Sequence, residues 1–146
     1  MSNLESAVKE LHALLNSPLA SVPQPDAHIK GPEGWTRKQI LGHLIDSAAN
    51  NHHRFVRAQF EPGMSIPSYA QKEWVAANQY SVRPWNELIE LWTIYNRHLL
   101  FLMEHVPKNV LANTCKVGQD EPATLEFLMV DYVRHLKHHL DQILSR

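Results

Sequence analysis

The chain has 146 residues, of which 44% are hydrophobic, and this composition fits one domain that buries about two-thirds of its unfolded surface. The 14 Lys and Arg residues nearly balance the 15 Asp and Glu residues, so the chain lacks the basic surface that nucleic-acid binding requires. Because no apolar run approaches the roughly 20 residues that span a bilayer, and no signal peptide is evident, we expect a single cytoplasmic domain over residues 1–146 without a membrane partner.

Hydrophobic periodicity predicts four long helices and no strand. The first helix covers about residues 4–15, and the proline-rich segment 18–34 that follows predicts a long irregular connection. The second helix begins after Thr36, because Thr36 and Gln39 have the spacing of a capping box. It extends to about Phe60, where a proline and a glycine end it.

The second half of the chain contains a short helix and two long ones. The short helix is expected at about residues 71–77, and the third long helix begins near Pro84 and ends before Pro107. The segment 107–123 is predicted to be a loop that is functional or contains a small hairpin. The fourth long helix begins near Thr124, so the sequence predicts an all-α domain.

The last helix carries three histidines in five positions. At about 100° per residue, His139 falls inside the apolar face of this helix, His135 lies at its edge, and His138 points toward solvent. Two imidazoles at positions i and i+4 can bind one metal ion. The same pair could instead interact with the C-terminal helix dipole or be solvated, and the spacing alone leaves these alternatives open.

The second helix carries a polar stripe beside its apolar face. His43, Ser47, Asn50 and Arg54 follow one another at positions i, i+4, i+7 and i+11. His43 is therefore a candidate third ligand, and Asn50 and Arg54 are candidates to orient an anionic or polar substrate. A solvated polar face would also explain the stripe. His52 falls on the apolar side and is expected to be a core histidine that is hydrogen-bonded through one nitrogen.

Three further residues have two interpretations each. His98 lies at the edge of the third helix's apolar face, where it can line a site or pack at the edge of the core. Trp74 can cover a pocket or anchor its short helix. Asp131 can accept the second N–H of His135, which would fix the tautomer of that ring, or it can pair with Arg134 on the same helix.

Cys115 and Asp46 complete the set of candidates. Cys115 is the single cysteine, which excludes an internal disulfide and suits a reducing compartment. A surface or half-buried bystander explains it better than a nucleophile does. Asp46 follows His43 by three residues and is a weaker candidate than Asp131 to support a ligand.

Two stretches together carry a family resemblance. The capped helix start WTRKQILGHLIDS and the last helix YVRHLKHHLDQI resemble the DinB-like superfamily. The segment KEWVAANQYSVRPWNELIELWTIYNRHL is similar to the YfiT-like branch of that superfamily, so the resemblance covers about residues 33–146. This branch includes metal-dependent hydrolases and bacillithiol transferases.

The resemblance implies an up-and-down four-helix bundle with one divalent metal at one end. The implied ligands are His43, His135 and His139. Three neutral imidazoles leave a coordination position open for water or a thiolate. Imidazole ligands suit zinc or nickel, and iron as well, so the ligand type does not select the metal.

The resemblance further implies an enzyme that acts on a small-molecule substrate. Two reactions are consistent with such a site: hydrolysis through metal-bound water, and transfer of a low-molecular-weight thiol to an electrophile. The alternatives are a metal-binding or ligand-binding bundle without turnover and a bundle whose histidines are incidental. The sequence does not fix the oligomeric state, and a homodimer remains an open alternative.

Overall fold

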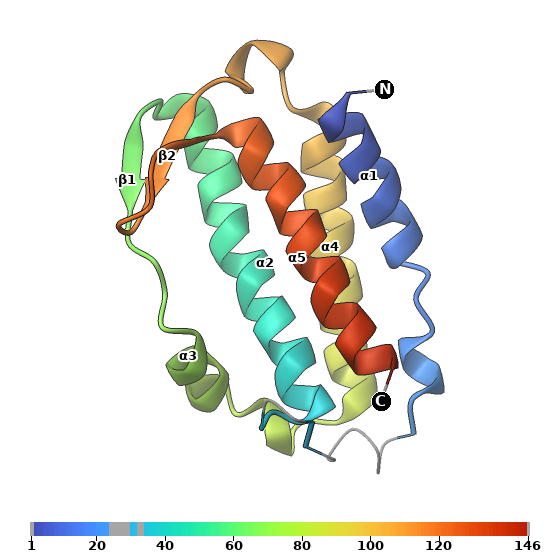
Figure 1. Cartoon of the computed structure of the whole chain (residues 1–146). Coiled ribbons are helices and arrows are strands. Elements are labelled where there is room, and N and C mark those ends of the chain that lie inside the picture. Colours follow the sequence, from blue (N-terminus) through green and yellow to red (C-terminus); the bar gives the residue numbers. More distant parts are fainter. Residues whose placement is uncertain (1, 24–29, 32–33, 146) are drawn as a thin grey trace.

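A computed structural model describes residues 2–23, 30–31 and 34–145 of the chain. Its framework consists of four long helices that pack side by side, and a shorter helix lies outside them (Figure 1). The predicted helical bundle is therefore confirmed. The long helices are α1 (Asn3–Leu14), α2 (Arg37–Phe60), α4 (Trp85–His105) and α5 (Leu125–Leu144), and the shorter helix is α3 (Gln71–Asn78).

The four helices form two parallel pairs. In Figure 1, α2 and α4 run in one direction, whereas α1 and α5 run in the other. Both α1 and α2 pack against α4 and α5. The connection over residues 61–84 carries the chain back along the bundle, which lets α4 start at the same end as α2. The bundle thus departs from a plain alternation of up and down helices.

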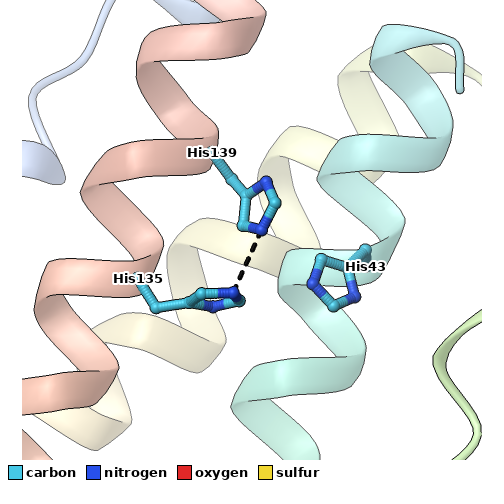
Figure 2. A group of neighbouring side chains, drawn as sticks. All are labelled: His43, His135 and His139. Carbon is cyan, nitrogen blue, oxygen red and sulfur yellow. Dashed lines mark hydrogen bonds between the residues drawn. The ribbon is translucent and has the colours of Figure 1, made fainter. Parts of the chain in front are cut away.

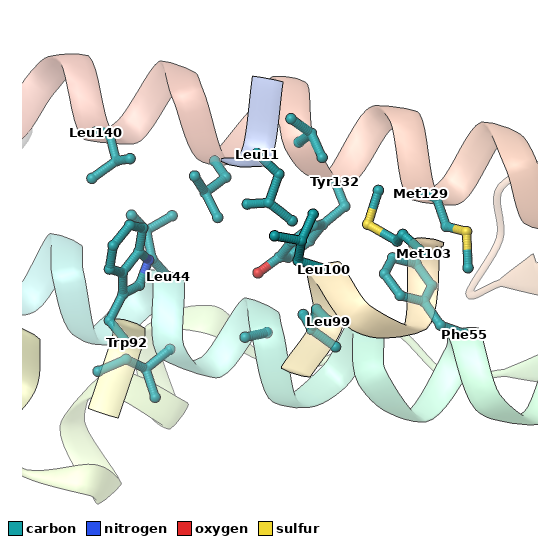
Figure 3. Close-up of a cluster of buried hydrophobic side chains, with 14 of the residues drawn as sticks. Leu11, Leu44, Phe55, Trp92, Leu99, Leu100, Met103, Met129, Tyr132 and Leu140 are labelled. Carbon is teal, nitrogen blue, oxygen red and sulfur yellow. The ribbon is translucent and has the colours of Figure 1, made fainter. Parts of the chain in front are cut away.

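The core fills the space between the four helices (Figure 3). Each large apolar side chain that is fully buried contributes about 1.5–3 kcal/mol, so this layer dominates the stability of the fold. Tyr132 brings a hydroxyl group into the core, where it donates to Asn96 Oδ1 at 2.6 Å. The largest buried side chains include Leu11, Leu44, Phe55, Trp92, Leu99, Met103 and Met129.

Side-chain caps fix the start of the two helices that carry the candidate ligands. Thr36 and Gln39 form the predicted capping box: the Gln39 backbone N–H donates to Thr36 Oγ1 at 3.1 Å, and the Thr36 backbone N–H donates to Gln39 Oε1 at 2.9 Å. Thr124 Oγ1 accepts from the Phe127 amide at 3.1 Å. Both caps satisfy backbone donors that a helix start leaves without partners.

The expectation that the chain has no strand is wrong. Three short strands, β1 (Met64–Ile66), β2 (Thr114–Val117) and β3 (Ala123–Thr124), form a sheet in the order β1-β2-β3. β1 pairs with β2 in parallel, and β2 with β3 antiparallel, which matches the hairpin alternative for segment 107–123. Segments this short show no alternation to read, and the partner of β1 is distant in sequence.

The described part of the connections contains the 3-10 helices η1 (Leu19–Ser21), η3 (Tyr80–Val82) and η4 (Lys108–Val110). Of the connection predicted to be irregular, residues 24–29 and 32–33 lie outside the described residues. Within the described ranges, every helix is too short or too polar to cross a bilayer.

Gly42 lets an aromatic ring from the η3 segment lie directly on α2. A Cβ atom at this position would stand 2.1 Å from Cδ2 of the buried Tyr80 ring. We expect Gly42→Ala to lower the free energy of unfolding by about 2 kcal/mol, because overpacking outweighs the roughly 1 kcal/mol by which helix propensity favours alanine. Urea denaturation measures the change. In a Tyr80→Ala background the same substitution should be neutral or stabilising, and an equal loss there would contradict the steric explanation.

Candidate metal centre

Three imidazoles from two helices converge on one point. Figure 2 shows His43 on α2 facing His135 and His139 on α5. One ring nitrogen from each residue lies within 4.8 Å of the others. His43 is buried at 1% exposure, and the other two rings are half-buried. The i, i+4 pair therefore meets the histidine of α2 in the interior, where α2 and α5 pack.

Hydrogen bonds define how the two α5 rings are held. His139 Nδ1 lies 2.9 Å from Gln142 Oε1, which only accepts, so His139 carries its proton on Nδ1. Its Nε2 then carries the lone pair and forms a second hydrogen bond with His135 Nε2 at 3.1 Å. A cation between these nitrogens would replace that bond with two metal–nitrogen bonds.

His43 is held mainly by its surroundings. Its Nδ1 is buried and has no hydrogen-bond partner within the described structure. The Trp35 ring packs on one side, with ring centroids 5.3 Å apart, and the His139 ring lies 4.9 Å away. Burial, reinforced by repulsion from His139 and His135, lowers the pKa of His43 from 6.5 to about 4. His43 is therefore neutral at pH 7.

Burial is also the main cause of the lowered pKa of His135, followed by repulsion from His139. Metal ions bind neutral imidazole, because the proton and the ion compete for the same lone pair. A buried His43 nitrogen without a hydrogen-bond partner in the described structure, next to two further imidazoles, is a set that fits a divalent ion. Nitrogen donors of this type suit zinc, nickel or iron.

Asp131 does not support the ligand pair as one interpretation of the sequence suggested. Its Oδ1 accepts from Arg134 Nε at 3.1 Å, and the described structure shows no hydrogen bond between Asp131 and His135. The alternative of an ion pair on the helix surface is correct. The residue that hydrogen-bonds to a candidate ligand ring is Gln142, which was not predicted from the sequence although it lies one turn beyond His139.

A pocket of about 430 Å³ adjoins the histidine cluster. His135 lines both, so a molecule in the pocket would reach the cluster from this side. The walls come from α2, α5, the sheet and the segment before α3. The lining residues are Ser47, Asn51, Arg54, Tyr69, Gln71, Cys115, Val117, Asp120, Glu121, Ala123, Phe127, Leu128, Asp131, Tyr132 and His135.

The polar stripe of α2 lines this pocket in part, and one predicted residue is replaced there by its neighbour. Arg54 lines the pocket as predicted, but Asn50 does not. The Asn50 side chain bonds back to the Asp46 carbonyl at 2.9 Å. Its neighbour Asn51 lines the pocket instead and donates to the Ser47 carbonyl at 2.8 Å. The pocket lies on the side of α2 that carries Ser47 and Asn51.

Trp74 does not line the pocket. It is 38% exposed and its ring packs against Tyr69, with centroids 5.5 Å apart. Tyr69 is the aromatic residue of this segment that faces the pocket, and the buried Val75 anchors α3. Neither interpretation of Trp74 is therefore fully correct, because Tyr69 lines the pocket and Val75 anchors α3.

His98 also lies away from the pocket. It is exposed, and its ring packs against His52 with centroids 5.0 Å apart. His52 Nδ1 makes the predicted single hydrogen bond, to the Tyr95 hydroxyl at 2.9 Å, although the His52 ring is half-buried. These two histidines form a separate contact between α2 and α4.

Cys115 is more deeply buried than expected. It is 1% exposed on β2, where the sequence predicted a surface or half-buried position. Burial raises the pKa of its thiol, so the protonated form prevails at pH 7. A protonated thiol is a poor nucleophile, which agrees with a bystander role.

Asp46 connects α2 to the segment that follows α3. Its Oδ1 accepts from the Tyr80 hydroxyl at 2.6 Å and from Asn78 Nδ2 at 3.0 Å, whereas Oδ2 is buried without a hydrogen-bond partner in the described structure. Burial raises the pKa of Asp46 from 3.8 to about 6, although both hydrogen bonds lower it. Asp46 thus holds the fold around Gly42, and it makes no bond to His43 in the described structure.

Substitution Asp46→Asn should stabilise the protein increasingly as pH rises. Between pH 3.8 and about 6 the folded state holds a proton on Asp46 that the unfolded state releases, so stability falls as pH rises. Asparagine removes this loss. Variant minus wild-type free energy of unfolding should increase by about 2 kcal/mol from pH 4 to pH 7, after allowance for solvent screening. Urea denaturation at both pH values tests this, and a constant difference would contradict the titration of Asp46.

The chain is similar to a known protein family and to relatives whose names refer to metal-dependent hydrolysis. The family model of the DinB superfamily matches residues 4–143. A "Putative metal-dependent hydrolase" of Oceanobacillus iheyensis is 29% identical over 112 residues, and one of Bacillus mycoides is 27% identical over 114 residues. Each match covers 77% of this chain, and the chain spans 64% of the length of either relative.

Two solved structures share the fold. YfiT from Bacillus subtilis, described as a probable metal-dependent hydrolase with an unusual four-helix bundle topology, has a TM-score of 0.82 at 23% identity and covers 97% of this chain and 82% of its own. A mycothiol-dependent maleylpyruvate isomerase has a TM-score of 0.78 at 15% identity, over 94% of this chain and 59% of its own. At these identities the likeness concerns the fold, and the match of the family model over residues 4–143 places the chain in its family. This protein belongs to the DinB superfamily.

Proposed function

We propose that this protein is a divalent-metal-dependent enzyme for a small molecule, with His43, His135 and His139 as the metal ligands. The observation that carries the proposal is the convergence of three ring nitrogens within 4.8 Å beside a pocket of about 430 Å³. Pockets of this size hold small ligands. The names of the relatives point to the same class, since they refer to metal-dependent hydrolysis and, in one neighbour, to a thiol-dependent isomerisation.

The chain's own residues prepare the centre before any ion binds. Gln142 keeps the proton of His139 on Nδ1, which directs the Nε2 lone pair to the cluster. Burial keeps His43 neutral, and the Trp35 ring packs against it and limits the access of water. A bound zinc, nickel or iron ion would supply a Lewis acid with a position open to water or a small thiol.

The pocket brings the substrate to this centre. His135 lies at the boundary between the cluster and the pocket, so a reacting group enters beside this ring. Ser47, Asn51 and Tyr69 offer polar groups along one wall, and Phe127 and Leu128 offer apolar surface. Hydrolysis of a small substrate and transfer of a low-molecular-weight thiol to an electrophile are the two reactions that such a site supports.

The test is an activity screen on protein loaded with zinc or nickel. The panel contains small esters and amides for hydrolysis, and low-molecular-weight thiols paired with an electrophilic haloarene for transfer. We expect turnover in one class, loss after chelation and recovery when the ion is restored. Metal that is retained without turnover across the panel would favour a binding module, and activity that survives complete chelation would reject the metal mechanism.

A further inference from the structure

Arg54 is a buried arginine that lacks an acidic partner. It lines the pocket at 9% exposure, and its Nε is buried without a hydrogen-bond partner in the described structure. Nη1 donates to Asn51 Oδ1 at 3.5 Å, at the limit of a hydrogen bond. Burial lowers the pKa of the guanidinium, which nevertheless stays charged at pH 7.

Two other arginines of the chain have acidic partners, which Arg54 lacks in the described structure. Arg57, three residues further along α2, binds Glu61 at 2.7 Å, and Arg83 binds Glu87 at 3.3 Å. Among the described residues, no carboxylate lies within 4.0 Å of the Arg54 guanidinium. Burial of a charge without a partner is unfavourable, so an anion in the pocket would recover part of the lost solvation free energy of Arg54.

The acidic residues of the pocket do not fill this role. Asp120 and Glu121 are exposed in the turn between β2 and β3, where water and salt screen their charges. Asp131 is already paired with Arg134 on the surface of α5. Burial lowers the pKa of Arg54 by more than the charge of Asp120 raises it, and none of these acidic groups forms an ion pair with Arg54 in the described structure.

We propose that Arg54 binds the carboxylate of the substrate and holds it in the pocket beside the three-histidine cluster. The planar guanidinium fork matches the two oxygens of a carboxylate. Arg54 follows His43 by about three helical turns, and helical side chains lean toward the N-terminus, which is the direction of His43. This inference rests on the proposed function, because it assigns the substrate class for the same pocket.

The other residues that line the pocket indicate the charge and polarity of the ligand. Arg54 is the one Lys or Arg among the residues that line the pocket in the described structure, which suits a monovalent carboxylate better than a phosphate dianion. Val117, Phe127 and Leu128 offer apolar surface beside it. The substrate class that fits is a small carboxylic acid with an apolar body, whose reactive group lies at a distance from the carboxylate.

The experiment compares matched probes that differ in charge. Hexanoate and hexanamide have the same shape, and calorimetric titration into full-length, zinc-loaded protein gives both dissociation constants. We expect hexanoate to bind about tenfold or more tighter than hexanamide, and Arg54→Met to remove this preference. The matched control is Arg57→Met, which removes a nearby arginine of the same helix that already has an acidic partner and should leave the preference intact.

Each outcome decides for or against the proposal. Equal binding of the two probes by the wild type, no hexanoate binding at millimolar concentrations, or a full preference in Arg54→Met would overturn it. If Arg54→Met fails to fold, the wild-type comparison and Arg54→Lys test the carboxylate subsite instead. Lysine keeps the charge but lacks the guanidinium fork, so Arg54→Lys should show a smaller preference for hexanoate than the wild type. If the protein prefers the carboxylate but shows no metal-dependent turnover, the carboxylate subsite is supported and the proposed enzyme activity is rejected. If it shows turnover but binds both probes equally, the enzyme activity is supported and the carboxylate subsite is rejected.

Discussion

Alanine at His43, His135 or His139 is expected to abolish retention of a divalent ion that the wild type holds at about one per chain. Each substitution removes one of three nitrogen donors, and two remaining imidazoles hold an ion too weakly to survive desalting. The three nitrogens lie within 4.8 Å of one another, and among the described residues they form the one such group of three or more metal-binding side chains. Elemental analysis after loading with zinc or nickel and desalting measures the occupancy.

Two further variants on α5 separate loss of a ligand from general damage. His138 is exposed, so His138→Ala should keep full occupancy. Gln142→Leu leaves all three ligands in place but removes the acceptor for His139 Nδ1, and we expect a 10- to 100-fold weaker affinity, typical of groups that orient a ligand. Full occupancy in all three alanine variants would show that the cluster is not the metal site.

The sequence was sufficient for features that depend on local periodicity and on neighbours within one helix. The start of α2 was predictable because Thr36 and Gln39 interact across three residues of the same turn. The separation of His135 and His139 from His138 was predictable because a helix rotates by about 100° per residue. Placing His43 with them needed the family resemblance, since nothing local states which face of α2 meets α5.

Features that depend on the packing of distant segments were not predictable. The helical wheel placed Asn50 on the polar stripe, whereas Asn51 lines the pocket, because the position of β2 and α5 against α2 decides which side of the helix faces it. The sheet was missed because β1 and β2 pair across a long separation. Gln142 was missed because a glutamine one turn from a histidine is common, and its bond becomes evident only from the ring orientation.

In metal-free protein, His43 and Asp46 are expected to change the free energy of unfolding in opposite directions between pH 4 and pH 7. Burial lowers the pKa of His43 from 6.5 to about 4, so within this range the unfolded chain binds a proton that the folded chain does not. The free energy of unfolding therefore falls as pH falls, by about 3 kcal/mol from this residue. Asp46, whose pKa is raised to about 6, acts in the opposite direction over nearly the same range.

The contributions of His43 and Asp46 should partly cancel in the wild type. Each contribution can be measured when the other residue is replaced. In His43→Asn the part of the acid loss that comes from His43 disappears, so wild-type minus variant free energy of unfolding should decrease by about 3 kcal/mol from pH 7 to pH 4. Asp46→Asn should instead steepen the acid loss, because the opposing contribution of Asp46 is removed. Urea denaturation in the presence of a chelator measures the free energy of unfolding of all three proteins.

Zinc should add stability to the wild type at pH 7, and this gain should shrink toward pH 4 as protons compete for the imidazoles. Parallel pH profiles for wild type and His43→Asn would mean that His43 is not buried as a neutral imidazole, and the chemical basis for the metal centre would then be lost.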